Sequence, residues 1–263
     1  MKTYKAIYLN LVYLLLYLPI AIVVTFSFNT SPKSLLWHGF STKWYQILFH
    51  DNAIFSVTLH SLTISTIAAT MAAILGTIAA INLFRYRFYG KKLIHGLLFI
   101  LVIAPDIILA IALLTLYNVL HFPLGFWSLL LAHITLCLPF VAITVYSRVV
   151  TLDKDIFVAA RDLGANDFVI FKRIVIPLLL PAIIAGWLLS FTLSLDDVII
   201  SYFVSGPGYE ILPLKIYSMV RMGVKPEVNA LCTIMLVATL FIVLIAQYLL
   251  KQNHEKNNSA AVN

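Results

Sequence analysis

The run AIYLNLVYLLLYLPIAIVVTFSF, residues 6–28, decides the class of this protein. It carries no charged side chain and is longer than the roughly 20 helical residues that cross the hydrocarbon core of a bilayer. It also exceeds the roughly 7–15 apolar residues of a signal peptide, so we expect a retained membrane helix. The whole chain agrees, because 62% of its 263 residues are hydrophobic and only 11% are charged. These proportions exclude an ordinary water-soluble globular protein.

Five further apolar segments predict five more membrane helices. Each is long enough to span a bilayer, and each is continuously apolar, whereas the strands of a membrane β-barrel alternate. The predicted fold class is therefore all-α, a polytopic membrane protein with six transmembrane helices in a single domain, residues 1–263. The five later segments are 57–84, 94–120, 124–146, 178–203 and 228–250.

The distribution of basic residues predicts the orientation of the helices. With both termini in the cytoplasm, thirteen of the eighteen Lys and Arg residues fall on the inner side. Lys and Arg are enriched in cytoplasmic loops, so we expect cytoplasmic termini in a multi-pass protein. The net charge of +7 then reflects topology and gives no indication of nucleic-acid binding.

Small residues repeat along one face of the second predicted helix. In lipid, such a face lets helix backbones approach closely, and we expect it to pack inside the helix bundle. The two cysteines, Cys137 and Cys232, lie in apolar runs and are expected to fill the core. The residues of the face are Ser61, Ser65, Ala69, Ala72 and Gly76.

Residues 151–177 form the one sizeable polar insertion on the inner side, and their pattern predicts two short helices joined by a turn. Such a unit suits a rigid knob that fits a groove on a cytoplasmic partner; a plain surface loop is the alternative. The candidate caps, turn residue and end of the unit are, in chain order, Asp153 or Asp155, Gly164, Asn166 or Asp167, and Pro177.

The segment from Ala159 to Ala165 (AARDLGA), followed by IVIP at 174–177, resembles the coupling loop of permease subunits in binding-protein-dependent ABC importers. That family's pattern begins Glu-Ala-Ala, and Val158 stands here at the Glu position, which weakens any charge-assisted contact there. The resemblance implies that the loop transmits motion from an ATPase subunit. The residues it assigns to that contact are Ala159, Ala160, Asp162, Gly164, Ala165, Asp167 and Pro177.

Almost the whole chain is similar to permease subunits of spermidine/putrescine importers. The similarity is carried by Trp44-Tyr45, Arg85 to Phe88, Pro105 to Ile107, Phe126 to Leu130, His133 to Thr135, Leu195 to Val198 and Tyr209 to Ser218. It implies a type I ABC importer transmembrane domain in the bacterial inner membrane, with a core at about 57–250 behind the first helix 6–28. It also implies a second permease subunit, ATPase subunits, a periplasmic polyamine-binding protein, a polyamine substrate and surrounding lipid as partners.

Three acidic residues lie inside predicted membrane helices: Asp106 near the middle of the third, and Asp196 and Asp197 in the fifth. Charges in lipid are costly and mark functional sites, and no Lys or Arg lies in a helix to neutralise them. A polyamine fits, because its amines stay protonated near neutral pH. The pattern leaves open which of the two adjacent residues faces the pathway. Trp44, outside the first helix, is a candidate cation–π contact at the entrance.

Rival functions remain at this point. A proton-coupled secondary carrier for cationic amines could also use acidic residues in its helices, and an ABC permease could serve another solute. An intramembrane enzyme lacks support, because no nucleophile or metal constellation is visible and we expect neither catalysis nor a cofactor. The chain contains no Gly-x-x-x-x-Gly-Lys-Ser/Thr loop, so ATP hydrolysis is expected in a partner.

Overall fold

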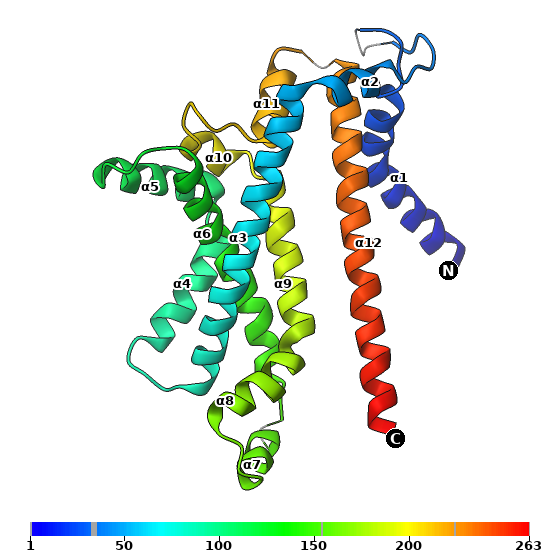
Figure 1. Ribbon diagram of the computed structural model, residues 1–263. Coiled ribbons are helices and arrows are strands. Elements are labelled where there is room, and N and C mark those ends of the chain that lie inside the picture. Colours follow the sequence, from blue (N-terminus) through cyan, green and yellow to red (C-terminus); the bar gives the residue numbers. More distant parts are fainter. Residues whose placement is uncertain (1, 33–35, 154, 224, 263) are drawn as a thin grey trace. The chain divides into compact units, whose positions relative to one another are not determined.

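The computed structural model describes residues 2–32, 36–153, 155–223 and 225–262 (Figure 1). In this part of the chain the only β pairing is a single bridge between Asn29 and Phe40, so the expected all-α class is confirmed. The helices are α1 (Lys2–Phe26), α2 (Lys43–His50), α3 (Asn52–Arg85), α4 (Lys91–Ile103), α5 (Asp106–Val119), α6 (Phe126–Val150), α7 (Asp155–Asp162), α8 (Asp167–Ile170), the π-helical η1 (Phe171–Val175), α9 (Ile176–Asp196), α10 (Ile199–Val204), α11 (Leu212–Arg221) and α12 (Pro226–Val262).

The described helices include five that are long and apolar enough to cross a membrane, and six such segments result if the bent pair α4 and α5 counts as one. The prediction of six spans agrees with the second count. The five continuous segments are Ile7–Phe26, Asn52–Arg85, Phe126–Val150, Asp167–Asp196 and Pro226–Leu244.

The third predicted helix, 94–120, is wrong as a continuous element. It consists of α4 and α5, which meet at an angle of 113°. Ala104 is extended, with ψ 136°, because a residue before proline is driven out of the helical region. Asp106 is therefore the first residue of α5 rather than a residue in the middle of a straight helix.

The fifth predicted helix, 178–203, is also interrupted. The helix α9 ends at Asp196, Asp197 has an extended ψ of 123°, and the short helix α10 begins at Ile199. Both predicted helices with acidic residues thus break at those residues. Discontinuous membrane helices leave backbone groups free at their ends, which is why such breaks line cavities or buried interfaces.

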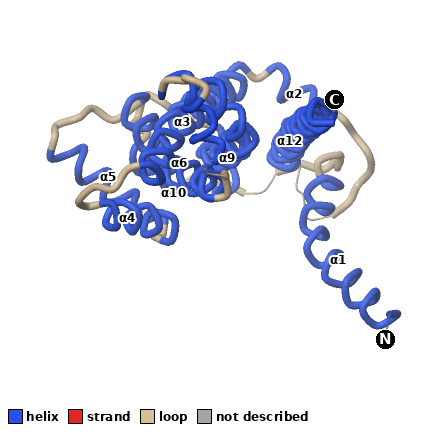
Figure 2. Tube along the Cα trace, turned by 90° about the horizontal axis from the view of Figure 1, so that it is seen from below, coloured by secondary structure: helices blue, strands red, loops and turns tan. Residues whose placement is uncertain are grey.

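The chain forms two compact units, residues 1–58 with 214–247 and residues 59–213 with 248–263. The core of the second unit lies between α3, α6 and α9, which are adjacent when seen nearly end-on in Figure 2. The predicted small-residue face of α3 is confirmed as a buried packing face. A Cβ atom on Gly76 would lie only 2.8 Å from Cβ of Val141, so α3 and α6 are in close backbone contact there.

Contacts fix which helix ends lie together in the second unit. At one end His60 of α3 bonds the carbonyl of Glu210, and Ser128 of α6 bonds the carbonyl of Val204. At the other end the last turns of α3 and α6 meet the segment 155–175, which carries Arg161 and Asp167. The helices α3 and α6 therefore run in the same direction.

The polar insertion folds as predicted into two short helices. Gly164, with φ +80°, makes the turn after α7, and Asn166 caps α8 by accepting a hydrogen bond from the backbone N–H of Val169 at 2.9 Å. The helix α8 continues through η1 into α9, so Pro177 lies within a continuous helical run, Asp167–Asp196, and does not begin a separate helix.

Candidate functional site

The structure brings together two of the predicted pathway residues, Asp106 and Asp196. Asp106 begins α5, which packs against α10, and Asp196 is the last residue before the break that leads into α10. Both side chains are exposed, and their carboxyl groups lie within electrostatic range of each other. Within the described part of the chain, neither forms an ion pair with a Lys or Arg residue. The result is an acidic pair between apolar helices.

Asp197 has a different environment from its neighbour. Its side chain is 8% exposed, and its oxygens accept hydrogen bonds from the backbone N–H groups of Ile200 and Ser201 at 3.2 and 2.8 Å. The Ser201 hydroxyl donates a further bond at 2.7 Å. Asp197 thus satisfies the free N–H groups in the first turn of α10, whereas contact with a solute stays a prediction for this residue.

His133 of α6 is the buried partner of this break, and the sequence pointed to it only as a polar residue within a predicted helix. Its side chain has no exposed surface. Nδ1 lies 2.6 Å from Oγ of Ser194, and Nε2 lies 2.9 Å from Oγ of Ser201 and 3.6 Å from Oδ2 of Asp197. One imidazole ring therefore links α6 to α9 and to α10.

Buried serines on one side of α9, Ser190 and Ser194, pack against α6. Ser190 and Cys137 bond each other's backbone carbonyls, with distances of 3.4 Å from Oγ and 3.3 Å from Sγ. Both are buried, so the expectation that Cys137 fills the core is confirmed. In contrast to these buried serines, Asp196 is exposed at the break.

Trp44, the predicted entrance residue, belongs to the first unit. Its indole Nε1–H donates a hydrogen bond to the carbonyl of Asn29 at 2.7 Å. The ammonium of Lys43 lies 5.9 Å from the centroid of its ring, within the range of a cation–π contact. Trp44 thus already has a cation of this chain near its ring.

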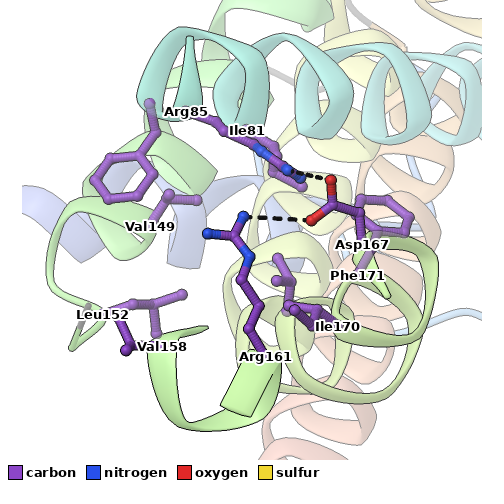
Figure 3. A pocket seen from close by; sticks show the side chains of 11 residues that line it. Ile81, Arg85, Val149, Leu152, Val158, Arg161, Asp167, Ile170 and Phe171 are labelled. Atoms are coloured by element: carbon purple, nitrogen blue, oxygen red, sulfur yellow. Dashed lines mark hydrogen bonds and ion pairs between the residues drawn. The ribbon is translucent and has the colours of Figure 1, made fainter. Parts of the chain in front are cut away.

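At the other end of the second unit, Asp167 connects three elements. Its carboxylate accepts hydrogen bonds from Arg85 at the end of α3, at 2.7 Å, and from Arg161 of α7, at 3.3 Å (Figure 3). Asp167 precedes the apolar part of its helix, so this cluster lies at the rim of the bundle.

A cavity of about 250 Å³ lies beneath these ion pairs. The view in Figure 3 shows the two guanidinium groups pointing toward Asp167 across it, with apolar side chains on the remaining walls. Residues from the ends of α3 and α6 and from α7, α8 and η1 line the cavity, namely Ile81, Phe84, Val149, Leu152, Val158, Ile170, Phe171 and Val175.

The remaining predicted coupling residues divide by exposure. Ala160 is buried in the core and anchors α7, and Ala165 is half-buried. Leu163 and Phe168 are 89% and 70% exposed. Sequence reasoning missed these two surface residues, because an apolar side chain in a short helix is normally expected to be buried. The exposed predicted residues are Ala159, Asp162, Gly164, Asp167 and Pro177.

Metal binding finds no support in the geometry of the described residues, where no three His, Cys, Asp or Glu side chains lie close enough to share an ion.

Comparison with known proteins assigns the chain to a family. Residues 72–255 match the model of the binding-protein-dependent transport system inner membrane component. The chain is 51% identical over 255 residues to the spermidine/putrescine transport system permease protein PotC of Escherichia coli (strain K12), covering 97% of this chain and 96% of that protein. It is 44% identical to the putrescine transport system permease protein PotI of the same strain, covering 94% and 90%.

Solved structures show the same fold at low sequence identity. A chain of a bacterial ABC transporter that imports the acidic polysaccharide alginate superposes with a TM-score of 0.75 at 16% identity, covering 95% of each chain. A chain of the inward-facing MetNI methionine ABC transporter gives a TM-score of 0.62 at 14% identity, covering 77% of this chain and 96% of that one. The fold, the family match and the close relatives agree, and the chain belongs to the binding-protein-dependent transport system inner membrane components.

Proposed function

We propose that this chain is the single-domain permease subunit of an ATP-driven polyamine importer in the bacterial inner membrane, with spermidine or putrescine as the solute. The observation that carries the proposal is the acidic pair of Asp106 and Asp196, which lies at two helix breaks without a Lys or Arg partner in the described chain. The 51% identity to a spermidine/putrescine permease over nearly the full length supports the same solute class.

The chemistry of the pair suits a flexible polycation. Asp196 ends α9, where the last backbone carbonyls lack partners within the helix and the helix dipole is negative. A cation is therefore attracted both by the carboxylate and by the end of the helix. Asp106 supplies a second carboxylate from another element. Polyamine ammonium groups stay charged near neutral pH and are joined by apolar methylenes, so they can meet these groups in succession. Passage requires release as well as capture, which two moderate sites permit.

The partners follow from the family. ATPase subunits would bind the knob formed by α7 and α8, where the exposed Leu163 and Phe168 offer apolar contacts, and would carry out the ATP hydrolysis. A second permease subunit would complete the pathway, and a periplasmic polyamine-binding protein would deliver the solute. In this arrangement both termini are cytoplasmic, Trp44 lies at the outer entrance, and Asp197 supports the pathway from inside the bundle.

The test is uptake of labelled spermidine and putrescine by the full complex carrying Asp106→Asn or Asp196→Asn. Each substitution removes one charge at nearly constant volume, and we expect uptake to fall on the order of tenfold or more as the counter-charge of the ammonium is lost. Asp51→Asn is the control, because Asn also accepts the hydrogen bonds that Asp51 receives from the backbone N–H groups of Ala53 and Ile54.

Two outcomes would contradict the proposal. Normal uptake in both Asp106→Asn and Asp196→Asn would reject the acidic pathway. Uptake by this chain reconstituted without the ATPase subunits, driven by a pH gradient, would instead identify a proton-coupled carrier.

A further inference from the structure

The hydrogen bonds around His133 have a defined direction. The Ser201 hydroxyl has one hydrogen, and it is donated to Oδ2 of Asp197. The Ser201 oxygen can therefore only accept from Nε2 of His133, which must carry a proton. With a neutral ring, Nδ1 accepts the hydrogen of the Ser194 hydroxyl. Each donor hydrogen in the series Ser194, His133, Ser201, Asp197 is then used, and all the bonds point in one direction, an arrangement in which they reinforce one another.

This network holds the elements that carry the acidic pair. The first turn of α10 is fixed by the bonds between Asp197 and Ser201. The last residue of α10 is fixed by the Ser128 hydroxyl, which donates to the carbonyl of Val204 at 2.7 Å. The helix α5 packs against α10, and the hydroxyl of Tyr117 near its end bonds the carbonyl of Ser128 at 3.0 Å. The first two turns of α6 thus anchor both α5 and α10.

We propose that His133 is a positioning residue for the acidic pair. It is fully buried and does not contact the solute; through Ser194 and Ser201 it fixes the break between α9 and α10, so that Asp196 stays exposed beside α5, which begins with Asp106, while Asp197 stays inside. The identity of the solute rests on the proposed function, whereas the arrangement of the two acidic residues does not.

The direct test measures how close the two positions lie. In the assembled complex, Asp106→Cys and Asp196→Cys are combined and treated with a short bifunctional thiol reagent, and the cross-linked fraction is followed by mass spectrometry. The parent chain with only its natural cysteines gives the background. Adding His133→Leu or Ser201→Ala should slow cross-linking by about tenfold, because each leaves buried polar groups without partners and frees the break.

Thr135→Ala is the matched control on the same helix, because the Thr135 hydroxyl bonds only the carbonyl of Leu131 within α6. It should leave the cross-linking rate unchanged. If His133→Leu does not assemble, His133→Gln takes its place; Gln keeps one donor and one acceptor and should preserve cross-linking better than Ser201→Ala. Equal cross-linking rates in the parent, the Ser201→Ala chain and the assembled His133 variant would overturn the proposal.

Uptake provides a second, independent measurement. If His133 acts through Asp196, then His133→Leu should lower the maximal rate of spermidine uptake in the natural chain and have little further effect in the Asp196→Asn chain. Effects that multiply would indicate a general structural role and contradict positioning. A wild-type complex that moves no polyamine but shows the expected cross-linking pattern would reject the solute and retain the role of His133.

Discussion

At the residue scale, substitutions at the adjacent Asp196 and Asp197 should have different effects: one at Asp197 should lower the stability of the complex, and one at Asp196 should lower its uptake activity. Replacing Asp197 with Asn turns one accepting oxygen into an amide donor, which then faces a backbone N–H group of α10. One buried hydrogen bond is lost, and both the backbone N–H group and the new amide N–H₂ group are left without an acceptor, at a cost of about 1–3 kcal/mol. We expect a lower unfolding temperature for the detergent-solubilised complex carrying Asp197→Asn, and a larger decrease for Asp197→Ala.

The control for this prediction is Asp196→Asn. Asp196 is exposed and holds no element of the described structure in place, so its loss should leave the unfolding temperature unchanged while uptake falls. Equal stability of the Asp196→Asn and Asp197→Asn complexes would show that the hydrogen bonds at the start of α10 contribute little.

Sequence reasoning could identify all three acidic residues but could not assign their environments. Charge in an apolar run marks both Asp196 and Asp197, and the sequence pattern leaves open which of them faces the pathway. The deciding contact is His133, which is 64 positions away along the chain, and no local pattern encodes it. A polar residue within a span is the only signal that could have pointed to such a partner.

At the element scale, the close contact between α3 and α6 predicts that alanine at Gly76 destabilises the complex, whereas alanine at a glycine outside this contact does not. Gly76→Ala places a Cβ 2.8 Å from the Val141 side chain and 3.0 Å from a backbone nitrogen, which cannot move aside. Overpacking costs about 1–3 kcal/mol, more than the roughly 1 kcal/mol that alanine gains in a helix, so the complex should melt at a lower temperature.

Gly96→Ala is the comparison for Gly76→Ala. Gly96 lies inside α4 and a Cβ there would meet no atom within 4 Å, so alanine should leave stability unchanged or raise it. A stabilising effect of Gly76→Ala would contradict the close approach of α3 and α6.

The ion pairs of Asp167 with Arg85 and Arg161 give a second prediction at this scale, which concerns the coupling of ATP hydrolysis to transport. They join the end of α3 to the knob of α7 and α8, and we expect Arg85→Gln to lower the amount of solute transported per ATP hydrolysed by the complex. The side chains are exposed, so the effect should be small and the pairs should be screened at about 1 M salt.

Arg87→Gln is the matched variant for the Arg85 experiment. It removes the same charge two residues away, and Arg87 forms no ion pair within the described structure, so coupling should be unchanged. Equal coupling ratios for Arg85→Gln and Arg87→Gln at low salt would show that the link between α3 and the knob carries no motion.

The helices were predictable from the sequence where one apolar run forms one continuous helix. They were not predictable where a helix breaks inside an apolar run. The packing face of α3 follows from small residues at helical spacing, and the structure buries it. The break at Pro105 had a local signal, because the residue before a proline avoids the helical region, but the length of the apolar run outweighed it in the prediction. The break at Asp197 depends on hydrogen bonds from α10 and the nearby His133, which only the folded bundle supplies.

At the scale of the whole molecule, the bent pair α4 and α5 must carry the chain from one side of the bundle to the other. The last turns of α3 and α6 line the same cavity, so these two helices are parallel. The chain leaves α3 at Arg85 and enters α6 at Phe126, at the opposite end. The segment between them therefore connects opposite ends of the bundle despite its bend of 113°, in agreement with counting α4 and α5 as one of six candidate spans. An even number of crossings predicts that both termini lie on one side of the membrane.

This topology predicts which exposed positions react with a membrane-impermeant thiol reagent in intact cells. Tyr89→Cys, in the turn between α3 and α4, and Leu163→Cys, at the tip of the knob, should both be protected, because basic residues flank these loops and favour the cytoplasmic side. Gly208→Cys, in the exposed loop at the other end, should be labelled. Opening the cells should expose the first two positions, and the parent chain reports any reaction of Cys137 and Cys232.

If α4 and α5 instead formed a re-entrant hairpin, Tyr89→Cys and Leu163→Cys would lie on opposite faces of the membrane. Labelling of only one of them in intact cells would therefore refute the six-crossing arrangement.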